Sequence, residues 1–229
     1  GLILDIGNKV MREAYDQLEI WQKQYGDIFK AKKFSKNKMP SPLTMSVNLA
    51  VRQLSDEKLL DNLNEIYEKT DVAPDTKILE ITESVLLGDT RHAITILNEI
   101  HSLGYKLRVD DFGTGYSALA YLKRFPIDGI KIDKSFIKGY DTNDNDTAIV
   151  RALIGLADSL HLDVVAEGVE TKAIEQSLHH LGCDYGQGFL YSRALPASEI
   201  DLRDYSVSKF DEESSNSDEV IDLTKRLSG

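Results

Sequence analysis

The sequence has few of the residues that hold small secreted proteins together or carry a chain through a membrane. Cys183 is the only cysteine among 229 residues, which excludes an internal disulfide and a cysteine-based zinc cluster. No apolar run approaches the length that spans a bilayer, and the first residues lack both a methionine and the layout of a signal peptide. We therefore expect a globular chain from a reducing, cytoplasmic setting that is cut from a longer protein, whose other parts could include a membrane anchor.

Positive charge is also scarce. The sequence has 27 Lys and Arg residues against 38 Asp and Glu residues, so its formal net charge is −11. This excess of acidic groups argues against general binding to a nucleic-acid backbone. An anionic ligand would have to be held through metal ions or by a local basic group.

Short apolar segments alternate with amphipathic segments along most of the chain. The apolar segments predict six strands, over residues 43–48, 78–82, 106–110, 129–133, 164–167 and 184–188. The amphipathic segments predict helices over residues 5–25, 55–66, 89–104, 119–122, 146–160 and 172–181. This order predicts a parallel sheet covered by helices in one domain, residues 1–205. A lysine-rich loop at 30–42 and an acidic, serine-rich tail at 206–229 are expected outside the packed elements.

A pair of neighbouring carboxylates follows the third predicted strand. The apolar run that ends at Val109 meets Asp110 and Asp111, and a Gly-x-Gly turn follows. Two adjacent carboxylates repel each other, so holding both at one strand end favours either a divalent metal or an acid/base dyad. The alternative is a helix cap or a solvated turn.

The other predicted strands also end in polar residues. These strand-end residues are Asn48, Glu80, Asp110 with Asp111, Lys131 with Asp133, Glu167 and Gln187. In a parallel barrel the carboxyl ends of the strands converge on one mouth, where such enzymes keep their sites. Carboxylate and amide oxygens without His or Cys suit Mg²⁺ or Mn²⁺ better than zinc. A two-metal site of this kind can clamp a phosphodiester, and Lys131 could stabilise the attacking water or the charge on phosphate.

Five sequence blocks closely resemble the EAL family of bacterial cyclic di-GMP phosphodiesterases. In order, they are SVNLAVRQL, LEITES, VDDFGTGYSALAYLKRFPIDGIKIDKSFI, VVAEGVET and GCDYGQGFLYSRALP. The resemblance covers about residues 1–200. It implies a TIM-like (β/α)8 barrel of the α/β class that hydrolyses cyclic di-GMP to linear pGpG. It also implies two Mg²⁺ or Mn²⁺ ions as cofactors, and inhibition by Ca²⁺.

The resemblance also implies roles for single residues. The implied metal ligands are Asn48, Glu80, Asp110, Asp111 and Glu167. Lys131 resembles the lysine that holds the catalytic water, and Asp111 and Glu167 are counted with it as catalytic. Supporting roles are implied for Asp133, Glu170 and Gln187. Glu83 resembles the glutamate that steadies the loop after the paired aspartates, which consists of Phe112, Gly113, Thr114, Gly115, Tyr116 and Ser117.

One block of the family is absent from this sequence. The Glu-Ala-Leu block, with an arginine shortly after it, would precede the helix with which the chain begins, and it would supply a metal ligand and a phosphate contact. We therefore expect an N-terminally truncated barrel with about six strands and two open edges. The resemblance further implies a homodimer and allows an upstream regulatory or GGDEF-type domain.

Two other functions stay open at this point. The first is a catalytically inactive domain that binds cyclic di-GMP as a receptor. The second is a metal-dependent barrel that acts on a non-nucleotide substrate, because fold analogy by itself does not fix function.

Overall fold

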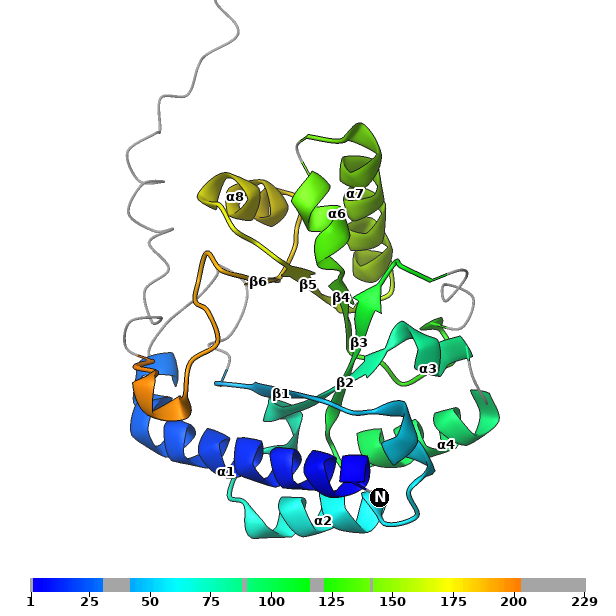
Figure 1. Cartoon of the computed structure of the whole chain (residues 1–229), viewed down its shortest axis with the longest axis vertical. Coiled ribbons are helices and arrows are strands. Elements are labelled where there is room, and N and C mark those ends of the chain that lie inside the picture. Colours follow the sequence, from blue (N-terminus) through cyan, green and yellow to red (C-terminus); the bar gives the residue numbers. More distant parts are fainter. Residues whose placement is uncertain (1, 31–41, 88–89, 116–121, 141, 203–229) are drawn as a thin grey trace, which may run out of the picture.

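Six parallel strands form one curled sheet, a half-barrel, in the computed structural model of the chain (Figure 1). The structure describes residues 2–30, 42–87, 90–115, 122–140 and 142–202. The strands are β1 (Met45–Asn48), β2 (Lys77–Thr82), β3 (Lys106–Phe112), β4 (Gly129–Ile132), β5 (Asp163–Glu167) and β6 (Tyr185–Gln187). Each strand pairs with the next one in chain order. The α/β class and the prediction of about six parallel strands are therefore confirmed.

Helices cover the convex side of this sheet (Figure 1). The α-helices are α1 (Leu2–Lys30), α2 (Leu59–Lys69), α3 (Glu83–Leu87), α4 (Thr90–Ser102), α6 (Lys134–Gly139), α7 (Asp144–Ser159) and α8 (Lys172–His180). Short 3₁₀ helices are η1 (Val51–Ser55), η2 (Pro74–Thr76) and η3 (Ala197–Glu199). Across the described ranges, none of the helices combines the length and the apolar character that crossing a bilayer requires.

The hydrophobic core lies between the helices and the convex face of the sheet. Every second residue of the central strands points into this core and is at most 1% exposed: Leu79, Ile81, Leu107, Val109, Ile130, Ile132, Val164 and Ala166. From α1, Met11, Tyr15 and Leu18 are fully buried at helical spacing. Burial of each large apolar side chain stabilises the fold by about 1.5–3 kcal/mol relative to exposure. This alternation leaves the intervening strand residues on the concave face.

The structure differs from the predicted elements mainly at short helices and at element ends. Helices α3 and α6 have five and six residues, too few turns to show a helical period in the sequence, and neither was predicted. Asp133, predicted as a strand residue, is instead the N-cap of α6 and accepts a hydrogen bond from the Ser135 amide at 2.9 Å. Helix α1 is longer than the predicted residues 5–25 at both ends, and β3 continues through the paired aspartates to Phe112.

Several predictions lie wholly or largely outside the described residues. They are the lysine-rich loop at 30–42, the short helix at 119–122 and the tail at 206–229.

Candidate active site

Four of the polar residues predicted at the strand ends gather on the concave face because strand residues alternate between the two faces: Glu80, Asp110, Lys131 and Glu167. Glu80 lies between Leu79 and Ile81, and Lys131 lies between Ile130 and Ile132; all four of these flanking residues belong to the convex core. Both polar side chains therefore point away from the helices. Glu80 and Lys131 are only 7% and 4% exposed, so their charges have to be satisfied by protein groups.

Lys131 is the centre of this cluster. Its Nζ atom lies 2.9 Å from Glu80 Oε2, 2.9 Å from Asp110 Oδ1 and 2.5 Å from Glu167 Oε1. The ammonium group has three N–H donors, and here it has three carboxylate partners, one from each of β2, β3 and β5. We call Lys131 with Glu80, Asp110, Asp111 and Glu167 the carboxylate–lysine cluster.

The ammonium form of Lys131 is strongly favoured. Burial alone would lower the pKa of Lys131, but hydrogen bonds to Glu167 and Asp110 and the charge of Glu80 outweigh it and raise the pKa above the ordinary lysine value. Lys131 thus stays a cation at any pH at which the protein functions. It can donate hydrogen bonds and stabilise negative charge, but it cannot accept a proton.

Asp111 holds its carboxyl beside that of Asp110 through an uncommon backbone conformation. Its φ angle is +54°, in the left-handed region that Asp tolerates better than most residues, and its amide donates to Asp110 Oδ1 at 3.1 Å. Desolvation and the charges of Asp110 and Asp133 raise the pKa of Asp111, and a hydrogen bond between its carboxyl and that of Asp133 adds to this. The repulsion expected from the adjacent aspartates is therefore present.

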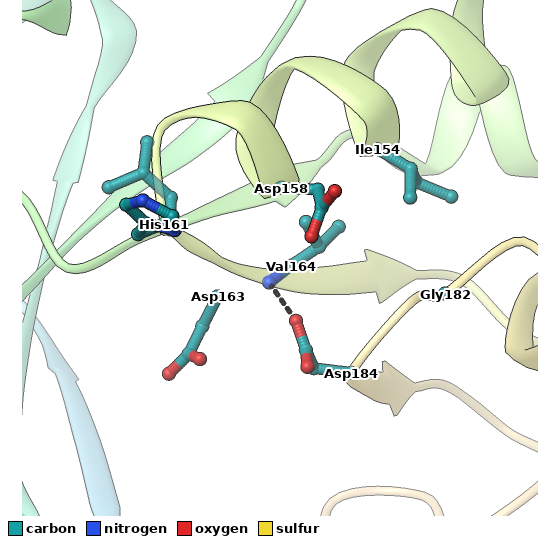
Figure 2. Close-up of a pocket in the computed structure, with 8 residues that line it drawn as sticks. Ile154, Asp158, His161, Asp163, Val164, Gly182 and Asp184 are labelled. Carbon is teal, nitrogen blue, oxygen red and sulfur yellow. Dashed lines mark hydrogen bonds between the residues drawn. The ribbon is translucent and has the colours of Figure 1, made fainter.

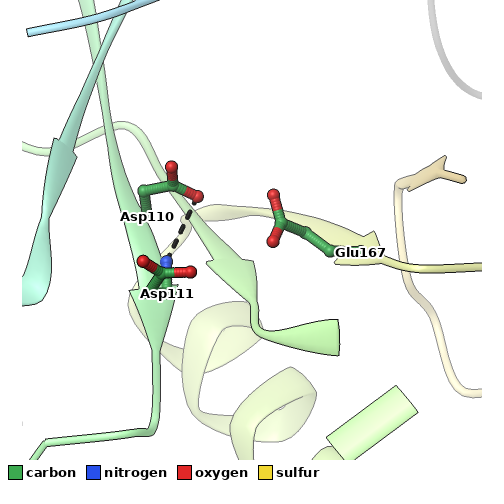
Figure 3. Close-up of side chains that lie close together, drawn as sticks. All are labelled: Asp110, Asp111 and Glu167. Atoms are coloured by element: carbon green, nitrogen blue, oxygen red, sulfur yellow. Dashed lines mark hydrogen bonds between the residues drawn. The ribbon is translucent and has the colours of Figure 1, made fainter. Parts of the chain in front are cut away.

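Glu167 faces the aspartate pair from the end of β5 (Figure 3). Asp110, Asp111 and Glu167 each place one carboxylate oxygen so that all three oxygens lie within 4.8 Å of one another. Burial raises the pKa of Glu167. The hydrogen bond and charge of Lys131 lower this pKa, whereas the negative charges of Asp110 and Asp111 raise it further. Three converging hard oxygen donors fit a divalent cation such as Mg²⁺ or Mn²⁺. Such an ion would relieve repulsion that a single lysine leaves partly uncompensated.

Glu83 connects α3 to the turn after the aspartates. Its Oε2 atom accepts hydrogen bonds from the amides of Gly113 and Gly115, both at 3.1 Å, and the residue is only 5% exposed. A Cβ atom at Gly115 would lie 2.6 Å from Glu83 Oε1, so glycine permits this close approach. Glu83 thus fixes the chain directly after Asp111.

The remaining predicted site residues lie near the cluster by strand register or outside the described part. The backbones of Asn48 and Gln187 are the strand partners of Glu80 and Glu167, and both side chains are exposed. Glu170 is exposed on the loop after β5. Among the described residues, no side-chain hydrogen bond joins these three to the cluster. Tyr116 and Ser117 lie outside the described residues, whereas Thr114 caps the turn by donating to Asp111 O at 2.9 Å.

The opposite ends of the strands carry a separate hollow of about 190 Å³ (Figure 2). It lies at the start of β5 and β6 and includes Asp158, Asp163 and Asp184 in its lining. Asp184 accepts a hydrogen bond from the Val164 amide at 3.0 Å, so this carboxylate serves the backbone of β5. This hollow contains no members of the carboxylate–lysine cluster, and we assign it no chemistry.

The sequence did not reveal Arg108, which lies on the same face of β3 as Asp110. Its side chain is only 12% exposed and faces Asp163. The signal that could have found it is a basic residue two positions before Asp110, on the same face as Asp110 and between the buried Leu107 and Val109.

Comparisons with known proteins agree with this geometry. MucR of Pseudomonas aeruginosa, named as a bifunctional diguanylate cyclase/cyclic di-GMP phosphodiesterase, is 36% identical over 200 residues, which are 87% of this chain and 27% of MucR. NbdA of the same organism, named as a cyclic di-GMP phosphodiesterase, is 40% identical over 165 residues, 71% of this chain and 21% of NbdA. The chain thus spans about a quarter of the length of the curated relatives that it matches.

A solved structure supports the same relationship. The PaMucR phosphodiesterase in complex with c-di-GMP superimposes with a TM-score of 0.76 at 37% identity, covering 86% of this chain and 74% of that chain. The model of the EAL domain family matches residues 1–194. Taken with the half-barrel and the acidic residues at the carboxyl ends of its strands, this match shows that the chain belongs to the EAL domain family.

Proposed function

We propose that the chain hydrolyses cyclic di-GMP to linear pGpG with two divalent metal ions, as the phosphodiesterase part of a bacterial signalling protein. The observation that carries the proposal is the carboxylate–lysine cluster, in which a permanently cationic lysine is surrounded by carboxylates at the carboxyl ends of parallel strands. The names of MucR and NbdA and the c-di-GMP complex of PaMucR support the choice of substrate.

The metal ligands in this proposal are Asn48, Glu80, Asp110, Asp111 and Glu167. Bound Mg²⁺ or Mn²⁺ would polarise the water and the phosphodiester. Lys131, whose three N–H donors meet carboxylates here, would orient the attacking water and stabilise the charge that develops on phosphate with a donor that a carboxylate releases. The P–O3′ bond breaks as the water oxygen joins phosphorus, and the released 3′ oxygen takes up the proton that the attacking water loses. Because Lys131 stays protonated, the proton of the water passes to a carboxylate, for which Glu167 is the candidate.

The structure around the cluster suggests how the other proposed residues contribute. Asp133 orients Asp111 through their shared hydrogen bond, and Glu83 holds the turn from which Asp111 projects. Gln187, the strand partner of Glu167, and Glu170, which follows β5, are exposed, and in this proposal both contact the ligand. We further propose that the parent protein acts in the cytoplasm, where the ligand is found, that it is a homodimer, and that it carries an upstream regulatory or GGDEF-type domain.

The test is hydrolysis of cyclic di-GMP by the purified chain with Mg²⁺ or Mn²⁺, followed as pGpG by chromatography. Glu167→Gln should lower the rate at least about 100-fold, because it removes a candidate proton acceptor and metal ligand. Glu68→Gln, an exposed change on α2, is the matched control and should keep the rate. Calorimetry with cyclic di-GMP and Ca²⁺ measures binding without relying on turnover.

The outcomes separate the three functions considered. Turnover that Glu167→Gln abolishes supports the phosphodiesterase. Binding without turnover, in this chain and in a longer form of the protein, would favour a receptor instead. Hydrolysis of other phosphate esters in preference to cyclic di-GMP would favour a metal-dependent barrel with a different substrate.

A further inference from the structure

One arginine side chain crosses the concave face of the sheet beneath the carboxylate–lysine cluster. Arg108 precedes Asp110 by two residues on β3, so both side chains point to the same face. Its Cα lies beside Glu80 of β2 on one side and Gly129 of β4 on the other. A guanidinium that is 12% exposed must find partners among protein groups, because it cannot lose its charge.

Gly129 gives this side chain the room to cross β4. A Cβ atom at residue 129 would lie 2.8 Å from the Asp163 carbonyl oxygen and 3.3 Å from Arg108 Cγ. The first distance is shorter than real Cβ contacts, so any larger residue would push β4 away from β5 or displace the arginine. Glycine at residue 129 therefore allows both the close approach of β5 and the passage of the Arg108 side chain.

The far end of the arginine contacts the next two strands. Arg108 Nη2 lies 3.7 Å from Asp163 Oδ2, at the start of β5. Arg108 Cζ lies 5.1 Å from the ring centroid of Tyr185, the first residue of β6. A planar, delocalised guanidinium suits this double contact, because it can pair with a carboxylate and lie over an aromatic ring at the same time. One side chain thus links β3 to β5 and β6.

We propose that Arg108, Asp163 and Tyr185 form a brace that sets the positions of the site residues, with Arg108 as its central positioning residue. Each residue of the brace precedes a site residue on the same strand. Asp110 is two residues after Arg108, Gln187 is two after Tyr185, and Glu167 is four after Asp163. The curvature of the sheet at the brace therefore sets the separation of Asp110, Glu167 and Gln187. The effect on metal and substrate rests on the proposed function, whereas the brace itself does not.

β6 is the shortest of the six strands and gains a contact from this link. It has three residues, all exposed, and it pairs with β5 only through Tyr185, Gly186 and Gln187. Neighbouring loop residues already contact it, because Tyr191 lies against Gly186 and the Val169 amide donates to the Gln187 carbonyl oxygen at 3.0 Å. Arg108 adds a contact at Tyr185 from the concave side of the sheet.

Hydrogen–deuterium exchange of the chain without metal or nucleotide tests the brace directly. Arg108→Met keeps an unbranched stem but removes the charge and the plane, and amide exchange in residues 185–190 should quicken about tenfold. Exchange in β2 should stay the same. Lys106→Met is the matched control, because Lys106 lies on the same strand but pairs with Asp128 at 2.6 Å. Unchanged exchange at 185–190 in Arg108→Met would overturn the proposal.

Titration with Mn²⁺, followed by calorimetry, tests the consequence for the site. Loss of supporting contacts typically weakens metal affinity by about 10–100-fold, so Arg108→Met should weaken Mn²⁺ binding about tenfold, whereas Lys106→Met should not. Arg108→Lys should recover only part of the affinity, since an ammonium lacks the stacking plane. Tyr185→Ala added to Arg108→Met should cause little further loss, because both changes break one unit.

The two measurements keep this inference separate from the proposed function. If the wild-type chain binds no Mn²⁺, the metal-dependent mechanism fails, and hydrogen exchange still decides whether the brace exists. If the wild-type chain binds Mn²⁺ and Arg108→Met binds it within twofold, the positioning role is wrong. Additive losses for Arg108→Met and Tyr185→Ala would contradict a single brace.

Discussion

Replacement of Lys131 by methionine should destabilise the fold and reveal the charges that the lysine compensates. Methionine fills a similar volume but leaves the carboxylates of Glu80, Asp110 and Glu167, whose side chains are 8–15% exposed, without their cation. Removing one partner from a buried ion pair typically costs about 3–5 kcal/mol, because the remaining charge is uncompensated. A typical domain is stable by only about 5–15 kcal/mol, so the loss should be a large part of the total.

The loss of stability in Lys131→Met relative to wild type should depend on pH in a definite direction. The raised pKa of Lys131 means that its stabilising effect is complete below the unfolded lysine pKa and is lost only as the pH rises through the folded value. Lys131 therefore contributes a constant amount at mildly acidic and neutral pH. In Lys131→Met the pKa of Glu167, which burial already raises, loses the opposing effect of Lys131, so protonation of Glu167 favours the folded state as the pH falls. The difference from wild type should be larger at about pH 8 than at about pH 5.

Urea unfolding with EDTA, followed by circular dichroism, measures this difference. Lys138→Met, an exposed change on α6, is the control and should stay within about 0.5 kcal/mol of wild type. Saturating Mg²⁺ should restore more stability to Lys131→Met than it adds to wild type, since the freed carboxylates bind the ion. A deficit below about 0.5 kcal/mol at neutral pH, or one that does not change with pH, would refute the assigned electrostatics.

Two further predictions concern the loop anchor and the buried thiol. Glu83→Ala should lower the free energy of unfolding by about 2 kcal/mol and speed amide exchange at Gly113 and Gly115, which lose their charged acceptor. Exchange by mass spectrometry checks this, with Glu83→Gln as the milder variant; unchanged exchange in Glu83→Ala would contradict the anchor. Burial raises the pKa of Cys183 from 9.0 to about 11, so at about pH 8 the thiolate is about 100-fold rarer than in the unfolded chain. Ellman's reagent should therefore react at least about 100-fold more slowly before urea is added, and equal rates would show that the thiol is accessible.

The sequence predicted the elements whose pattern is long enough to be repetitive. The strand at 129–133 and the helix at 146–160 were placed to within a few residues, because their apolar positions recur with the period of their secondary structure. Helices α3 and α6 were missed, since five or six residues show no period. The left-handed backbone at Asp111 was equally hidden, because nothing in the local pattern distinguishes it from an ordinary strand residue.

The sequence by itself determined that polar residues end successive strands and that Asp110 and Asp111 are adjacent. It could not determine which carboxylates Lys131 contacts, because Glu80 and Asp110 lie 51 and 21 residues away and meet it only through strand register and sheet curvature. The position of Arg108 also depends on tertiary structure. A basic residue in a strand predicts an exposed side chain, and only the tertiary structure, with Gly129 leaving space and Tyr185 offering a ring, places it under the site. Which residues are neighbours along a strand follows from the sequence. Which distant charged residues form ion pairs depends on the pairing of the strands and the curvature of the sheet.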